Sequence, residues 1–200
     1  MRIQLIRHGQ TPMNVAQVID TAAPGAPLTE LGREQAASLP GRLEGVPLES
    51  IYVSNLIRTH QTAAPLAADR GIDPVVREGI REIQAGSLEM GDTKQDYDSY
   101  FRTIVSWFDG DLTKRMGGAE SGHEVLERFD EVIQEIEGTG ANEIAVVSHG
   151  GMIVMWAGMR AKGLSMDLVI GHHPENTGIC VVEGSFAEGF RALSWMGQGV

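Results

Sequence analysis

Residues 144–151, with the sequence IAVVSHGG, combine an apolar run with a polar turn that carries a histidine. Four consecutive apolar residues indicate a strand that is buried on both faces of a sheet. The turn His149-Gly150-Gly151 follows directly, and a helix pattern runs from there to about Met159. This order is typical of a parallel strand that ends in a loop and passes into a covering helix.

The start of the chain repeats this arrangement, because the apolar-rich run Arg2–Ile6 leads directly into Arg7 and His8. Further strands are expected at residues 51–53 and 178–183, with an edge strand at 190–195. Apolar spacings of three and four predict the intervening helices, which are expected at 30–43, 55–69, 93–108 and 122–137. Strands that alternate with helices predict an α/β fold, a three-layer α/β/α sandwich with a mostly parallel central sheet.

Composition and charge narrow the functional classes. The chain has 200 residues, 42% of them apolar, and it shows no repeat or linker, so we expect one domain over residues 1–200. A net charge of −11 argues against nucleic-acid binding, which needs a basic face. The single cysteine, Cys180, fits a reducing compartment, and the apolar stretches are too short to span a bilayer. We therefore expect a soluble, cytoplasmic protein without a membrane partner.

Residues that could bind an oxyanion follow three of the expected strands. Ligands of parallel sheets bind beyond the carboxyl ends of the strands, and His8 and His149 both lie at such ends. Arg7 precedes His8, and Arg58 follows another strand. A guanidinium group is a planar fork suited to phosphate oxygens, and the helix N-terminus after His149 favours an anion. Each residue alone could be structural, but together they predict an oxyanion-binding site.

Six ordered blocks of this sequence resemble motifs of the histidine phosphatase superfamily, in its phosphoglycerate-mutase-like branch. The blocks are Leu5–Thr11 with Asn14, Leu28–Ala36, Ser54–Ala63, Arg81–Gly86, Glu120-Ser121 and Ser148–Gly151. Asn176 matches a later motif. An Arg-His-Gly triplet alone is weak evidence, whereas six blocks in the family's order are specific. The resemblance implies a phosphoglycerate-mutase-like sandwich, with one histidine-phosphatase domain, that transfers phosphoryl groups.

The resemblance also implies a role for each matching residue. His8 is implied to be the nucleophile that becomes phosphohistidine, and Glu82 the acid that protonates the leaving oxygen. The implied phosphate pocket consists of Arg7, Gln10, Asn14, Arg58, His149 and the Gly150 N–H. Phosphoryl transfer depends on positioning and charge neutralisation, so two arginines and a cationic histidine suit it without a metal ion.

The segment at about residues 86–118 follows Glu82 and is expected to form a lid-like insertion over the pocket. It is rich in aromatic side chains, and we expect these to form a roof on one helix face and to pack on the core with the other. The aromatic residues are Tyr97, Tyr100, Phe101, Trp107 and Phe108, and the segment's cations are Lys94, Arg102, Lys114 and Arg115.

Two acidic residues bear on the kind of phosphoryl transfer. Glu89 and Asp92 place negative charge where the second phosphate of a bisphosphate would dock, and a mutase must retain that intermediate. We therefore predict a phosphomonoesterase that hydrolyses a small organic phosphate. Two alternatives stay open, a phosphoglycerate mutase and a non-catalytic module that binds a phosphorylated ligand.

No cofactor or metal ion is expected. The pair His172-His173 lacks further ligands at suitable spacing, so a place at the pocket rim is favoured over a metal site. The sequence contains no Gly-rich nucleotide loop. Cys180 has apolar neighbours and is expected to be an unreactive core residue. The expected partner is a small phosphorylated metabolite, and a homodimer is an open expectation.

Overall fold

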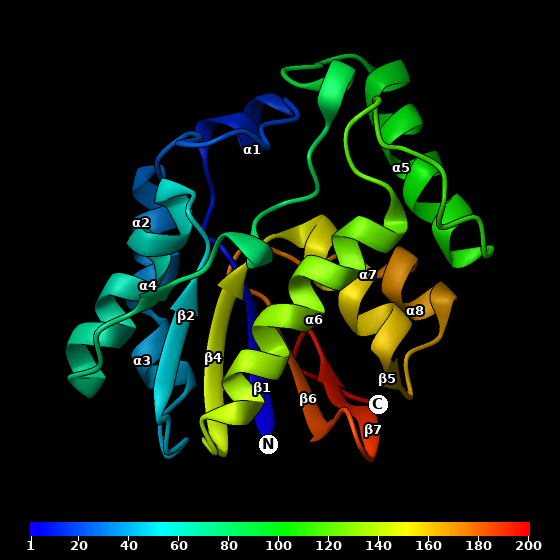
Figure 1. The fold of residues 1–200 in the computed structure, drawn as a ribbon. Coiled ribbons are helices and arrows are strands. Elements are labelled where there is room, and N and C mark those ends of the chain that lie inside the picture. Colours follow the sequence, from blue (N-terminus) through cyan, green and yellow to red (C-terminus); the bar gives the residue numbers. More distant parts are fainter.

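A central sheet forms the middle layer of the protein (Figure 1). The computed structural model describes residues 1–200 apart from the side chains of Met166 and Ile170. The strand order is β3-β2-β4-β1-β6-β7-β5, with β8 paired to β7. The strands are β1 (Arg2–Arg7), β2 (Ser50–Val53), β3 (Val75–Val76), β4 (Glu143–Ser148), β5 (Ala161–Lys162), β6 (Ile179–Ser185), β7 (Gly189–Trp195) and β8 (Gln198–Gly199). Strands β1 to β4 are parallel, whereas β6 is antiparallel to β1 and β7.

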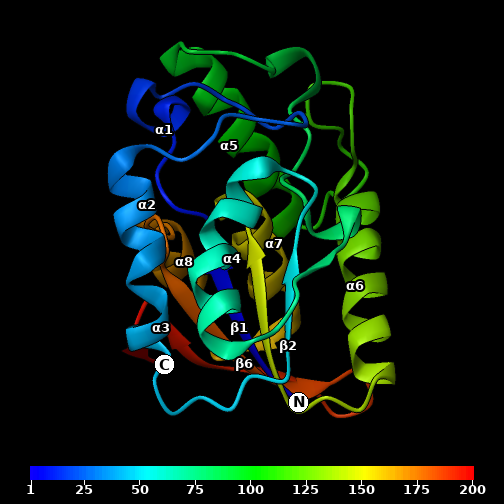
Figure 2. The ribbon, with the colours of Figure 1, turned by 90° about the vertical axis from the view of Figure 1, so that its left-hand side faces the viewer.

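Helices cover both faces of the sheet (Figures 1 and 2). They are α1 (Pro12–Ala16), α2 (Glu30–Ala37), α3 (Leu39–Arg42), α4 (Ile57–Arg70), α5 (Lys94–Phe108), α6 (Gly122–Gly138), α7 (Gly150–Arg160) and α8 (Met166–Gly171). One buried cluster joins Ala145 and Val147 of β4 to α3 and α4, and a second joins Ile144 and Val146 to α6 and α7. This alternation along β4 confirms the predicted three-layer sandwich.

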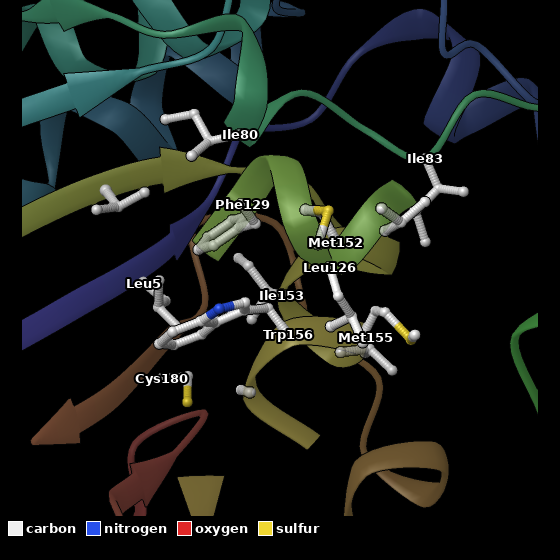
Figure 3. Close-up of a cluster of buried hydrophobic side chains, with 14 of the residues drawn as sticks. Leu5, Ile80, Ile83, Leu126, Phe129, Met152, Ile153, Met155, Trp156 and Cys180 are labelled. Carbon is white, nitrogen blue, oxygen red and sulfur yellow. The ribbon is translucent and has the colours of Figure 1, made fainter. Parts of the chain in front are cut away.

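Trp156 of α7 lies at the centre of the larger cluster (Figure 3). Its indole stacks on Phe129 of α6, with ring centroids 5.1 Å apart, and meets Phe190 of β7 edge to face. Cys180 of β6 is buried in the same cluster, and burial raises the pKa of its thiol to about 12. Because the thiolate is the reactive form, Cys180 is the unreactive core residue that the sequence predicts.

Two expected elements differ in the structure. The helix expected at 30–43 is divided at Ser38 into α2 and α3, because Pro40 has no N–H with which to continue the helical hydrogen bonds. The expected edge strand is β7, and the edge assignment is wrong because β7 pairs with β6, β5 and β8. A two-residue strand such as β5 or β8 carries no alternation that a sequence could reveal.

The carboxyl ends of β1, β2 and β4 meet at one edge of the sheet and point toward the end of the molecule that carries α1 and α5 (Figure 1). Arg7 is in register with Ser148, and Val53 with Val147. The residues that follow these strands therefore leave the sheet at the same level. None of the helices in the described part of the chain is both long enough and apolar enough to cross a membrane.

Two glycines let the loop after β1 dock on α2. A Cβ atom on Gly9 would lie 2.6 Å from the carbonyl oxygen of Gly32, and a Cβ atom on Gly32 would collide with the carbonyl oxygen of Gln10. The backbone of the loop after β1 is thus in direct contact with the backbone of α2, and this contact determines the position of His8 relative to the sheet.

We expect Gly32→Ala to lower the free energy of unfolding by about 1–3 kcal/mol, because the added methyl group meets backbone rather than a side chain that can move. Urea unfolding measures this. Gly41→Ala in α3 is the matched control, since nothing lies within 4 Å of its Cβ position and the change favours the helix. Equal stability of the two variants would contradict the proposed backbone contact.

Candidate active site

A cavity of about 120 Å³ opens at the carboxyl edge of the sheet, between the ends of the central strands and α5. Its polar side includes Arg7, His8, Asn14, Asp20, Arg58 and Glu82, and its apolar side includes Met13, Val18, Ile19, Tyr97, Phe101 and Ile104. These residues come from segments far apart in the sequence. The structure therefore brings together most of the residues that the sequence singled out.

His8 follows β1 and is fixed by its own loop. The side chain is only 3% exposed, and Nδ1 lies 2.8 Å from the carbonyl oxygen of Gly9. A carbonyl only accepts, so Nδ1 carries the hydrogen and Nε2 keeps its lone pair. Burial lowers the pKa of His8 well below its usual range, and Arg58 and Arg7 lower it further. His8 is a neutral imidazole with one available nucleophilic nitrogen.

Arg7 and Arg58 are the two arginines that line the cavity. Arg7 donates from Nη1 to the carbonyl oxygen of Pro174 at 2.6 Å. Arg58, in the first turn of α4, donates from Nη2 to the carbonyl oxygen of Asp20 at 2.9 Å and pairs with the Asp20 carboxylate at 3.4 Å. Both guanidinium groups are bound through their Nη atoms. The Nε atoms of both are buried without a hydrogen-bond partner in the described structure.

His149 lies beside His8, with ring centroids 5.2 Å apart. It is fully buried, and Nε2 lies 2.8 Å from Ser54 Oγ, while Nδ1 has no partner among the described residues. Burial lowers the pKa of His149 well below its usual range, and Arg58 and His8 add to this. The sequence led us to expect a cationic histidine, whereas burial and the nearby Arg58 favour the neutral form of His149.

Glu82 lines the cavity at the N-terminus of α7. Its carboxylate accepts from the N–H groups of Met152 at 3.0 Å, Gly151 at 3.2 Å and Ile83 at 2.9 Å. The helix N-terminus after His149 was expected to bind the ligand anion, and here Glu82 supplies the negative charge instead. Gly150 itself lines the cavity, where a Cβ atom would lie 2.8 Å from His173.

Asn14 lines the same cavity. Its Oδ1 accepts from the N–H of Thr11 at 3.1 Å and from Asn176 Nδ2 at 3.2 Å, so its amide group is oriented by the protein. Asn176 also donates to the carbonyl oxygen of His8 at 3.0 Å, which explains why the late motif lies near the site. Gln10 does not line the cavity, because its side chain accepts from Thr29 Oγ1 at 2.9 Å. The structure therefore does not place Gln10 in the expected phosphate pocket.

The aromatic residues of α5 divide along the helix axis and not between opposite faces. Tyr97, Tyr100 and Phe101 line the cavity, whereas Trp107 is fully buried and donates to the carbonyl oxygen of Lys114 at 2.8 Å. Phe108 packs against the larger core cluster. The helix extends from the cavity to the core, so its N-terminal half forms the roof and its C-terminal half packs inside.

The acidic residues also lie differently from the expectation. Glu89 accepts from Thr21 and from the N–H of Ala22, and neither Glu89 nor Asp92 lines the cavity. Asp20 does, through its pair with Arg58. No sequence pattern identified Asp20, because its loop has no regular pattern and its partner Arg58 lies 38 residues away.

His173 lines the cavity as the sequence predicts, whereas His172 is exposed outside it. The His173 ring meets Phe101 edge to face, with centroids 5.7 Å apart. Burial, with a contribution from Arg7, lowers the pKa of His173 to about 4. Within the described residues, no three His, Cys, Asp or Glu side chains gather where they could hold a metal ion.

The model of the histidine phosphatase superfamily (branch 1) matches residues 3–196. The chain therefore belongs to this superfamily, as the sequence motifs indicated.

Individual relatives differ in length and in name. The PE-PGRS family protein PE_PGRS11 of Mycobacterium tuberculosis is 35% identical over 98% of this chain, which spans only 36% of that protein. The adenosylcobalamin/alpha-ribazole phosphatase of Escherichia coli is 31% identical over 76% of this chain and 75% of its own length. A Cronobacter sakazakii protein named probable phosphoglycerate mutase GpmB is 29% identical over 75% and 70%.

A solved structure shares the fold over almost the whole chain. The mycobacterial glucosyl-3-phosphoglycerate phosphatase in complex with VO3 has a TM-score of 0.81 and 24% identity, and the match covers 97% of this chain and 98% of that one.

We expect the free energy of unfolding to fall as the pH is lowered from 7 to 5. The unfolded imidazoles take up protons near pH 6.5, whereas folded His8 and His149 stay neutral well below that and His173 stays neutral to about pH 4. The unfolded state thus binds more protons in this window, which costs up to about 1.4 kcal/mol per pH unit for each imidazole. Urea unfolding at pH 7, 6 and 5 measures the slope, and His173→Gln should reduce it. Stability that is constant or rises on acidification would contradict the neutral buried histidines.

Proposed function

We propose that the chain is a metal-independent phosphomonoesterase that hydrolyses a small organic phosphate through a phosphohistidine at His8. One observation carries the proposal. Arg7 Nε, Arg58 Nε and His149 Nδ1 are buried at or beside the cavity without partners among the described residues. An unpaired buried polar atom costs roughly 1–3 kcal/mol, and a phosphate group has acceptor oxygens enough to pair all three.

In the first step, His8 Nε2 attacks the phosphorus atom. The Nε2–P bond forms, the bond from phosphorus to the alcohol oxygen breaks, and Glu82 gives its proton to that oxygen. Arg7 and Arg58 stabilise the charge on the equatorial oxygens. When Ser54 donates its hydroxyl hydrogen to His149 Nε2, the ring hydrogen of His149 lies on Nδ1. The Nδ1–H group of His149 then donates to the phosphate as well.

In the second step, water replaces the histidine. Glu82 takes a proton from the water molecule as its oxygen bonds to phosphorus, and the Nε2–P bond breaks to release inorganic phosphate and neutral His8. The Gly9 carbonyl group keeps the hydrogen on Nδ1 throughout, so the electron pair that returns to Nε2 regenerates the nucleophile. No step requires a metal ion, since Arg7 and Arg58 supply the cationic charge.

The charge around the cavity favours hydrolysis over mutase chemistry. A mutase holds a bisphosphate and needs a second anion site. The transferred phosphate takes up Arg7 and Arg58, and Asp20 already pairs with Arg58, so little positive charge is left for a second phosphate. Incubation with 3-phosphoglycerate discriminates these alternatives. A phosphomonoesterase that accepts it releases phosphate, whereas a mutase isomerises it. A non-catalytic binding module would do neither.

Three further expectations belong to this proposal. Residues 86–118 act as a lid within one domain of residues 1–200, which the position of α5 over the cavity supports. A cytoplasmic location is supported by the lone buried cysteine. A homodimeric state stays a prediction that light scattering can test.

We expect label from a ³²P-labelled phosphate monoester to appear on His8 when the reaction is quenched without acid. His8→Asn should abolish both label and turnover, and dialysis against a chelator should leave the wild-type rate within a factor of a few. Label on His149, or activity that a divalent ion alone restores, would overturn the assignment.

We expect Glu82→Gln to reduce the first turnover of an alkyl phosphate by about 10²–10⁴-fold, because the amide cannot protonate an alkoxide. Nitrophenyl phosphate has a much better leaving group and should lose far less. Burst kinetics separate this step from hydrolysis of the phosphohistidine. Equal losses on both substrates would mean that Glu82 only shapes the cavity.

A further inference from the structure

We infer that the alcohol part of the substrate is uncharged and predominantly apolar, with an aromatic or alicyclic ring that fits between α5 and the segment after α1. This inference rests on the proposed hydrolase activity and specifies its substrate class. Three observations carry it: a group of apolar residues in the cavity lining, the small number of cations in that lining, and a second apolar cavity that shares residues with the first.

The apolar wall is formed by two segments that are joined to each other. Val18 and Ile19 follow α1, while Phe101 and Ile104 lie on α5, and all four line the cavity. Ile19 exchanges backbone hydrogen bonds with the segment before α5, donating to Gly91 at 2.9 Å and accepting from Met90 at 2.8 Å. The wall is therefore a built surface and not a chance meeting of loops.

Phe101 is the exposed member of this wall. It lines the cavity but is 41% exposed, although it is one of the largest apolar side chains of the protein. Exposed aromatic surface beside a ligand site gains free energy when an apolar group covers it. A ring bound at the phosphate site would cover Phe101 in this way.

The charge of the cavity disfavours a second anionic group. Its lining cations are Arg7 and Arg58, which the transferred phosphate occupies, and Asp20 and Glu82 are the acidic residues beside them. His173 also lines the cavity, and its pKa of about 4 keeps it neutral at pH 7.

The cations of the lid-like segment 86–118 do not supply further positive charge to the cavity. Lys94, Arg102, Lys114 and Arg115 all lie outside the cavity lining. Lys94 pairs with Asp98, and Arg115 pairs with Glu124. A carboxylate on the substrate would therefore meet apolar side chains and Asp20, without a cation to replace its lost hydration.

A second, smaller cavity of about 30 Å³ adjoins the apolar wall. It is lined by apolar residues of α5, α7 and α8, including Val105, Phe108, Val154 and Val169. It shares Phe101, Ile104, Gly151 and His173 with the first cavity. Empty space behind Phe101 and Ile104 lets these side chains retreat, so the wall can adapt to a ring larger than the first cavity holds.

A matched pair of esters tests the inference, because they differ by one carboxylate and have similar leaving groups. Benzyl phosphate should be hydrolysed with a kcat/KM at least about tenfold above that of 4-(phosphonooxymethyl)benzoate, and at least about tenfold above that of ethyl phosphate. Phe101→Ala should lower kcat/KM for benzyl phosphate by about tenfold through KM, with ethyl phosphate changed less than about twofold. Phe101→Lys should shift the preference toward the carboxylated ester.

Arg102→Ala is the control, since Arg102 is exposed on the same helix and lines neither cavity. Equal or faster hydrolysis of the carboxylated ester by the wild-type protein would overturn the inference while leaving the hydrolase activity in place. Release of phosphate from none of the esters, with no phosphohistidine formed, would overturn the proposed function and this inference with it.

Discussion

The parallel pairing of β1 with β4 determines the site on which all further chemistry depends. Because Arg7 is in register with Ser148, the next residue of each strand is a histidine, and the two rings leave the sheet 5.2 Å apart. Two buried imidazoles at this distance cannot easily both carry charge. The backbone register thus brings the His8 and His149 rings together. It does so through main-chain hydrogen bonds, and a slip of one residue in this register would turn every side chain to the other face.

The protein binds the guanidinium groups of Arg7 and Arg58 only through their terminal Nη atoms. Pro174 accepts from Arg7, and the Asp20 segment accepts from Arg58, while the Nε atom of each guanidinium stays unpaired. Arg7 and Arg58, whose charges lower the pKa of His8, are therefore also available to bind a phosphate dianion. Glu82 adds a carboxylate that α7 holds in place with N–H groups, so acid and cations are fixed before a ligand arrives. Such preorganisation is the main source of catalysis in phosphoryl transfer.

The sequence predicted most of this arrangement where the information is local. Thr29, Thr93 and Ser121 cap helices at or next to their expected starts, and β4 could be found from four apolar residues. The motifs identified His8, Arg7, Arg58, Asn14 and Glu82, all of which line the cavity. Their catalytic roles stay predictions.

What the sequence could not predict depends on tertiary contacts. Gln10 turns to Thr29 and not to the cavity, Glu89 binds the backbone of Ala22, and Asp20 pairs with Arg58. The protonation of His149 depends on burial and on four neighbouring charged or titratable groups from other elements, so no motif could show it. The neutral, apolar side of the cavity is also a property of packing between α5 and the segment after α1.

A crystal structure with bound orthovanadate tests the central claim, that the register of β1 and β4 builds one phosphoryl-transfer site from unpaired buried nitrogen atoms. The account predicts vanadium bonded to His8 Nε2, with vanadate oxygens within hydrogen-bond distance of Arg7 Nε, Arg58 Nε and His149 Nδ1. Vanadate bonded to His149, or bound in the cavity while these three nitrogen atoms stay unpaired, would contradict it.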